Sequence, residues 1–244
     1  MRLGLKHTNC LFRYKTCIER GIGAMNENIC KTIFDKLMAE LPALWKGEET
    51  ILYMKENGCR NWRQMEWPGW YFQFMCETIL SKDNFFAIPG PAYGKVEFDG
   101  QKVIPWDFKA HTANTGTNQN KVPTNGYQEV MKAIEEYGRV GFIIASGDAV
   151  FDDKDQTFKK WHDALKGKTS DYEKKRIARQ APSRRRKASF KLDAIRFVIL
   201  DKTTVQYCGS FQGGMRNSNG VARNPKVMLD VSDTRLEQYI FKVQ

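Results

Sequence analysis

The sequence predicts an α/β (α+β) fold, in which helices flank a mixed central β-sheet. Helical periodicity dominates the first eighty residues, two strand-like runs follow, and helix and strand patterns then alternate towards residue 244. This order is typical of a sheet covered by helices. The length of 244 residues suits one large domain or two small ones, and with 41% hydrophobic residues we expect a single domain. We divide it into a mainly helical part (1–60), a central part (61–166) and a basic part (167–244).

Two helices are predicted in the first eighty residues. Residues 24–41 place Ile29, Ile33 and Leu37 at helical spacing, with Asn26 or Asn28 as the cap. A second, buried helix is expected from about residue 68, because a proline stands near its start and aromatic residues follow at helical spacing.

The middle of the chain predicts a β-hairpin. Two strand-like runs flank the dipeptide Asp99-Gly100, which is a strong signal for a tight turn. Residues 112–126 are polar and are expected to form a loop, with Asn125 capping the helix that follows over 126–137. Beyond Gly138 we expect the strand "RVGFIIAS", the helix "TFKKWHDAL" and the longer strand "ASFKLDAIRFVIL".

The charge of the chain is concentrated in one segment. Between Lys154 and Lys226 there are 19 basic and 6 acidic residues, whereas the rest of the chain has 20 basic and 22 acidic residues. The whole net charge of +11 therefore arises from this segment. Such an excess favours a polyanionic partner, most often nucleic acid, over a merely solvated basic face.

The composition also argues against several other classes of protein. No stretch approaches the roughly 20 apolar residues that cross a bilayer, and the start of the chain is interrupted by charge, so we expect a cytoplasmic protein without a membrane partner. The six cysteines form no CxxC pair and do not stand at zinc-ligand spacing with the three histidines. We expect reduced thiols and no structural zinc site.

A carboxylate and an ammonium group stand two residues apart at the end of the second strand-like run, "VIPWDFKAHT". Residues i and i+2 of a strand project from one face, so Asp107 and Lys109 are expected to point together while Phe108 enters the core. Carboxylate oxygens are the ligands that Mg²⁺ prefers, and a lysine orients water or stabilises charge on a phosphate. This combination suits phosphodiester hydrolysis, although an ordinary ion pair is the alternative.

The stretch "VEFDGQKVIPWDFKAH" resembles the active-site hairpin of the PD-(D/E)xK nuclease superfamily, to which many type II restriction endonucleases belong. Asp107 and Lys109 match the D/E-x-K half. The family's first acid has no perfect counterpart, because "PGP" stands at 89–91, where a proline-aspartate pair is sought. The resemblance covers about 45 residues and implies a restriction-endonuclease-like core.

The resemblance also implies roles for individual residues. It assigns Asp99 and Asp107 as metal ligands for Mg²⁺, Lys109 to the attacking water, and Glu77 as a supporting acid. Glu97 and Asp83 are the alternatives to Asp99, and Glu66 is the alternative to Glu77. His111, beside the D-x-K motif, is a candidate for a supporting polar group or an ordinary surface residue.

Two segments of the basic part are candidates for contact with double-stranded DNA. The first carries the run Arg184, Arg185, Arg186 and Lys187, whose charges suit phosphate contacts. The second is a turn-rich loop in which Gln212, Arg216, Asn217 and Asn219 have side chains that read base edges. A mobile tether and ordinary turns are the respective alternatives.

The sequence therefore favours a Mg²⁺-dependent, sequence-specific DNA endonuclease of the type II restriction class. A palindromic target would imply a homodimer by symmetry. Two alternatives stay open: a non-catalytic nucleic-acid-binding protein with a structural acidic cluster, and a repair or RNA nuclease of the same fold.

Overall fold

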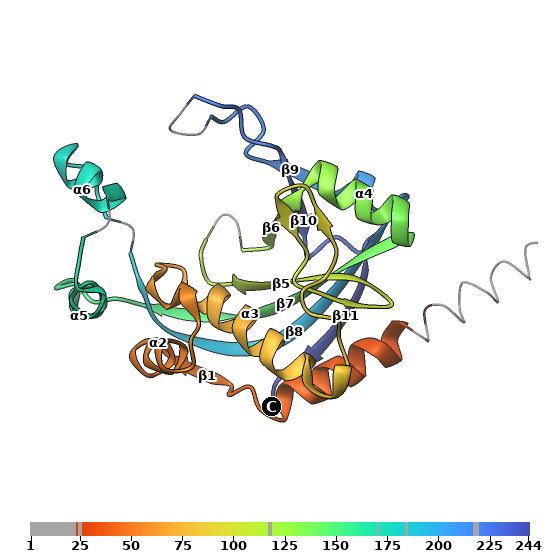
Figure 1. The fold of residues 1–244 in the computed structure, drawn as a ribbon, viewed down its shortest axis with the longest axis horizontal. Coiled ribbons are helices and arrows are strands. Elements are labelled where there is room, and N and C mark those ends of the chain that lie inside the picture. Colours follow the sequence, from red (N-terminus) through yellow and green to blue (C-terminus); the bar gives the residue numbers. More distant parts are fainter. Residues whose placement is uncertain (1–22, 24–25, 117–118, 170, 184, 217–219) are drawn as a thin grey trace, which may run out of the picture.

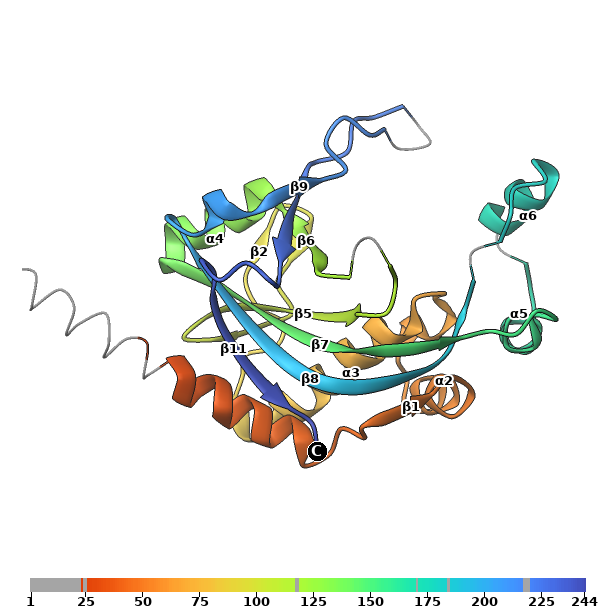
Figure 2. The same cartoon turned by 180° about the vertical axis from the view of Figure 1, so that it is seen from behind.

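The computed structural model describes residues 23, 26–116, 119–169, 171–183, 185–216 and 220–244. At its centre lies a six-stranded, strongly curved sheet (Figures 1 and 2). In spatial order its strands are β1 (Leu44–Lys46), β8 (Lys187–Asp201), β7 (Arg139–Phe151), β5 (Ile104–Thr112) and β4 (Gly100–Lys102), and β11 (Glu237–Lys242) also pairs with β8. The pair β5–β7 is parallel and the other pairs are antiparallel. The predicted mixed sheet is confirmed.

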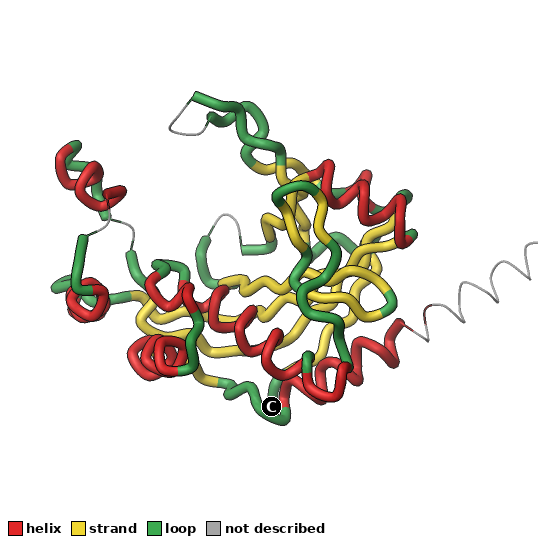
Figure 3. Tube along the Cα trace, in the orientation of Figure 1, coloured by secondary structure: helices red, strands yellow, loops and turns green. Residues whose placement is uncertain are grey.

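Helices flank this sheet, as the tube in Figure 3 shows. They comprise a helix over residues 26–38, α2 (Gly47–Glu56), α3 (Trp67–Leu80), α4 (Tyr127–Tyr137), α5 (Thr157–Lys166) and α6 (Asp171–Ala178), with short 3₁₀ turns at Arg60–Arg63, Lys82–Asn84 and Val205–Tyr207. The two helices predicted in the first eighty residues are thus present. None of the helices in the described part of the chain is long and apolar enough to cross a membrane.

The two faces of the sheet belong to two separate cores. The alternation of side chains along β7 sends Ile143 to the core shared with α2, α3 and the helix over 26–38, and sends Phe142 and Ile144 to the core beneath α4. The first core is rich in aromatic rings, and Trp45 stacks on Phe190 with ring centroids 4.7 Å apart. Both faces of the central strands are therefore buried, which explains their continuous apolar runs.

Two smaller sheets complete the fold. One is three-stranded and antiparallel, with the order β6 (Lys121–Gly126), β10 (Lys226–Asp230) and β9 (Gly209–Phe211), and the other is the ribbon of β2 (Ala92–Tyr93) and β3 (Val96–Glu97). The prediction of a continuous loop over 112–126 was wrong at its end, because β6 forms there and pairs with the distant strand β10. A single-sequence pattern does not reveal such a long-range pairing.

The hairpin turn lies elsewhere than the sequence predicts. Lys102 pairs with Ile104 and Gly100 pairs with Trp106, so the chain turns at Val103, which has a positive φ of 64°. Gly100 is required by close packing and not by a turn conformation, because a Cβ atom on it would lie 2.9 Å from the ring of Phe86.

Two projections extend from the sheet within the basic segment from Lys154 to Lys226. Helices α5 and α6 connect β7 to β8 at one end of these long strands, and the segment between β9 and β10 extends away from the body (Figure 1). The four cysteines in the described residues, Cys30, Cys59, Cys76 and Cys208, are free, in agreement with the expected reduced thiols. Cys10 and Cys17 lie outside the described residues.

Candidate active site

Strand β5 brings Asp107 and Lys109 together on one face. The Lys109 ammonium forms an ion pair with Oδ2 of Asp107, while Phe108 enters the aromatic core from the opposite face. Asp107 is almost fully buried, with 2% of its surface exposed. This local geometry follows from the two-residue period of a strand.

Asp99 lies beside this pair. Its Oδ2 atom accepts a 2.6 Å hydrogen bond from the N–H of Phe108, because β4 begins only at Gly100 and leaves the edge of β5 uncovered beyond Trp106. Burial and the neighbouring Asp107 carboxylate raise the pKa of Asp99 to about 8. Two acids in one low-dielectric site cannot both ionise freely.

The pKa of Lys109 reflects the same pair of acids. Burial alone would lower it, but the charges of Asp107 and Asp99 raise it above the ordinary value for lysine. The side chain therefore stays an ammonium group at neutral pH.

Helix α3 contributes a third acid through a neutral bridge. The amide nitrogen of Gln73 donates 2.8 Å hydrogen bonds to Oε1 of Glu77 and to Oδ1 of Asp99. Burial raises the pKa of Glu77, the bond from Gln73 lowers it, and the charge of Glu97 raises it. The sequence analysis missed Gln73, although its position four residues before Glu77 places both on one helical face.

Two further residues of the site come from the smaller sheet. Nδ2 of Asn125, at the end of β6, donates a 3.0 Å hydrogen bond to Oδ1 of Asp107. The prediction that Asn125 caps α4 was wrong, because Gly126 occupies the N-cap position. Lys226 on β10 is also close: burial and the charge of Lys109 lower its pKa, whereas Asp107 raises it.

We refer to Asp99 and Asp107 together as the dyad. The three alternative acids, Glu97, Asp83 and Glu66, do not join it. Glu97 and Asp83 are exposed, and Glu66 is engaged in a 2.5 Å ion pair with Lys187. Within the described ranges, none of these three hydrogen-bonds to the dyad. Geometry therefore favours Asp99 and Glu77 over their alternatives.

His111 lies further along β5. Its Nε2 atom is 2.6 Å from the carbonyl oxygen of Gln119, and burial lowers its pKa. This contact joins β5 to Gln119 in the loop that follows the strand. It indicates a structural role for His111.

The donor set suits a hard cation that takes few protein ligands. In the described residues, no group of three or more His, Cys, Asp and Glu side chains is placed to hold a metal ion. The dyad supplies two carboxylates, and Mg²⁺ usually takes only one or two together with waters and phosphate oxygens. Burial first and the Asp107 carboxylate second raise the pKa of Asp99, and a bound cation would favour its ionised form.

The candidate DNA contacts have different surroundings. Arg185 is exposed and lies over the ring of Phe151 at 5.0 Å, and Lys187 is paired with Glu66. In the loop between β9 and β10, Gln212 has a positive φ of 66°, and the exposed Arg216 donates to the carbonyl of Gly220. Arg184, Asn217 and Asn219 lie outside the described residues.

The structure argues against Arg186 as one of the expected phosphate contacts on the surface. Only 7% of its surface is exposed, and its guanidinium group lies 3.7 Å from Asp163 on α5. The carbonyl of Arg186 accepts a 2.8 Å hydrogen bond from the N–H of Asp152, which places the residue at the rigid start of β8. Its position does not fit an exposed phosphate contact.

Comparison with protein-family models, with curated proteins and with solved structures finds no match to this chain. The functional argument therefore depends on the geometry of the site itself.

Proposed function

We propose that the chain is a Mg²⁺-dependent, sequence-specific double-stranded DNA endonuclease of the type II restriction class, with a PD-(D/E)xK core. The observation that supports this most is the convergence of Asp99, Asp107 and Lys109 at the uncovered edge of β5. An ordinary surface ion pair would be solvated, whereas Asp107 is buried and Asp99 and Lys109 are partly buried.

In this proposal Asp99 and Asp107 are the residues that hold Mg²⁺. When bound, the ion supplies Lewis-acid polarisation of the phosphate and an acidified water. Hydrogen bonds from Phe108 and Asn125 fix the two carboxylates in place, so the ligands are oriented before the ion arrives.

Lys109 acts as a cation in this scheme rather than as a base. Its raised pKa keeps the ammonium protonated, so it stabilises negative charge that develops on the phosphate and donates a hydrogen bond to the attacking water. Glu77 supports the dyad through Gln73 and does not itself contact Asp99 directly in this arrangement.

The basic part of the chain supports DNA as the substrate. The segment from Lys154 to Lys226, with 19 basic and 6 acidic residues, provides the sequence-independent attraction that a duplex requires. Arg185 and Arg216 are exposed and suit phosphate or base contacts. If the target is palindromic, two copies of the chain bind it as a homodimer.

Incubation with supercoiled plasmid, with Mg²⁺ or with EDTA, tests the proposal. Discrete fragments that require Mg²⁺ support a restriction enzyme. A smear indicates a nonspecific nuclease of the same fold, and cleavage of RNA alone indicates an RNA nuclease. Binding without cleavage indicates the non-catalytic nucleic-acid-binding protein and contradicts the proposal.

A further inference from the structure

A cavity of about 650 Å³ lies apart from the residues of the dyad. It is bounded by the segment after the 3₁₀ turn Arg60–Arg63, helices α5 and α6, and the segment that leads into β8. Its lining carries six basic side chains and two acidic ones: Arg63, Lys159, Lys166, Lys168, Arg176 and Arg186, with Asp163 and Glu173. The volume lies within the range of small-molecule sites.

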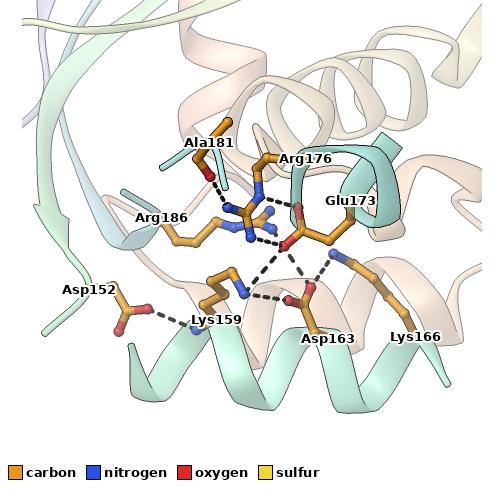
Figure 4. Close-up of polar contacts among 8 residues, drawn as sticks. All are labelled: Asp152, Lys159, Asp163, Lys166, Glu173, Arg176, Ala181 and Arg186. Carbon is orange, nitrogen blue, oxygen red and sulfur yellow. Dashed lines mark hydrogen bonds and ion pairs between the residues drawn. The ribbon is translucent and has the colours of Figure 1, made fainter. Parts of the chain in front are cut away.

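Two carboxylates hold four of these cations, as Figure 4 shows. Asp163 lies 3.1 Å from the ammonium groups of both Lys159 and Lys166 and 3.7 Å from the guanidinium of Arg186. Glu173 pairs with Arg176 at 2.7 Å and with Lys159 at 3.6 Å. The network therefore has more positive than negative charge.

The basic side chains of this network are shielded from water. The exposed fractions of Lys159, Lys166 and Arg176 are 16–17%. Arg186 is only 8% exposed at its side chain, and its Nε atom has no hydrogen-bond partner among the described residues. A buried guanidinium donor without an acceptor is costly, so an acceptor from outside the protein would stabilise this site.

The neighbouring titratable groups experience the same positive field. Burial and the charge of Lys166 hold the pKa of the buried His162 at about 4, and Arg186 contributes in the same direction. The pKa of Lys166 is also lowered, by burial first and then by Arg186 and Lys159, against the effect of Asp163. Cations are therefore crowded at this place.

The cavity is held by rigid elements. Lys159, Asp163 and Lys166 follow one another at helical spacing on α5, whose first turn donates two N–H groups to the carboxylate of Asp152. The same Asp152 donates its own N–H to the carbonyl of Arg186. Helix α5 and the start of β8 are thus tied together, which positions Lys159 and Lys166 relative to Arg186.

We propose that this cavity binds a phosphate-bearing ligand of nucleotide size. The cations hold the phosphate, with Arg186 as its buried donor, and the side chains of Met65, Ile177 and Pro182 contact the uncharged part of the ligand. The site does not depend on the proposed nuclease activity. The phosphate belongs either to a free nucleotide or to a nucleic-acid strand.

Calorimetric titration of the full chain with each of the four nucleoside 5′-monophosphates tests the site, with the matching nucleosides as phosphate-free probes. We expect saturable binding of at least one monophosphate, with a dissociation constant of about 1 mM or below, and no binding of its nucleoside. Absence of binding by all four monophosphates, or equal binding of the nucleoside, would overturn the proposal.

Substitutions in the lining of the cavity test whether the monophosphate binds there. Arg186→Met should weaken it about tenfold or more, because a charge-assisted hydrogen bond is removed. The matched control Lys174→Met, an exposed lysine outside the lining, should bind as the wild type does. If Arg186→Met does not fold, Lys168→Met at the rim carries the test, with weakening of about threefold or more. Equal affinities in the pocket variants and the control would overturn the proposal.

Two further titrations identify the source of the phosphate and distinguish the phosphate site from the proposed nuclease activity. Displacement of the monophosphate by a short DNA duplex assigns the phosphate to nucleic acid, and its persistence assigns it to a free nucleotide. Asp107→Asn, which is outside the cavity, should bind the monophosphate unchanged even though it removes cleavage. Failure of nuclease activity would therefore leave this result intact.

Discussion

The carboxyl group of Asp99 lies beside that of Asp107, because Gly100 pairs with Trp106 and the chain turns only at Val103. A turn at Asp99-Gly100 would have placed Asp99 at the tip of the hairpin. The actual register instead lays it against the uncovered edge of β5, where it accepts the N–H of Phe108. The two acids, Asp107 buried and Asp99 partly buried, therefore lie at one point, and the predictions below follow from that arrangement.

Asp99→Asn should separate stability from activity. The asparagine oxygen still accepts the hydrogen bond from Phe108, but the repulsion from Asp107 is removed. We expect the metal-free protein at pH 8 to gain about 1 to 3 kcal/mol in free energy of unfolding, measured in urea. Cleavage should fall by about a hundredfold or more. Asp83→Asn, at an exposed position, is the control, and an Asp99→Asn protein that is less stable yet fully active would reject the account.

Gln73→Leu should weaken the reaction without removing a charged group. The change deletes the donor that holds Glu77 and Asp99 together, and groups that orient metal ligands typically affect activity about 10- to 100-fold. The loss should appear as a higher Mg²⁺ requirement in cleavage assays. Thr78→Ala, on the exposed side of the same helix, should retain wild-type activity. An unchanged Mg²⁺ requirement in Gln73→Leu would show that the bridge has no role.

The lowered pKa of His162 predicts that the folded protein loses stability in mild acid. Its pKa is about 4 in the folded protein and about 6.5 in the unfolded chain, so the unfolded chain binds the proton more readily. The stability is fully present above pH 6.5 and is lost progressively as the pH falls towards 4. Between pH 7 and pH 5 this residue should account for about 1 to 2 kcal/mol of the free energy of unfolding.

Urea unfolding of the wild type and of His162→Gln at both pH values measures that contribution. Glutamine does not titrate, and it retains a donor for the carbonyl of Trp62, which lies 3.0 Å from Nε2 of His162. The variant should lose less stability than the wild type on acidification. Equal losses would mean that His162 is not the group that titrates.

Arg185→Gln should alter the salt dependence of DNA binding. Each phosphate contact contributes about 0.9 to the slope of log affinity against log salt, so the slope should decrease by about that amount. Lys31→Gln, on the helix over residues 26–38 and paired with Asp35, is the matched surface control and should leave the slope unchanged. A slope that responds equally to both changes would indicate a general charge effect rather than a contact.

Local periodicity predicted part of this site, and long-range packing determined the rest. The shared face of Asp107 and Lys109 follows from the period of a strand, and the aromatic helix from about residue 68 was also expected. The turn was misplaced because Gly100 satisfies a close approach to the ring of Phe86, which no local signal distinguishes from a turn glycine.

The remaining site residues depend on contacts between segments far apart in the sequence. Asn125 reaches Asp107 because β6 pairs with β10, about a hundred residues away, so its side chain is directed to the site rather than to a helix cap. Arg186 was expected to contact phosphate together with its neighbours in the run, yet it is buried and lies beside Asp163 of helix α5. Charge patterning alone does not tell which arginine in such a run is buried.

The most direct test of the central claim is the cleavage of supercoiled plasmid by Asp107→Asn, measured together with its affinity for a DNA duplex in the absence of metal. The substitution retains the size of the side chain but removes a metal ligand and the charged partner of Lys109. The account predicts that Mg²⁺-dependent cleavage falls by about a thousandfold or more, while affinity stays within about threefold of the wild type. Cleavage at the wild-type rate by this variant would contradict the assignment of the Asp99–Asp107 site as the active site.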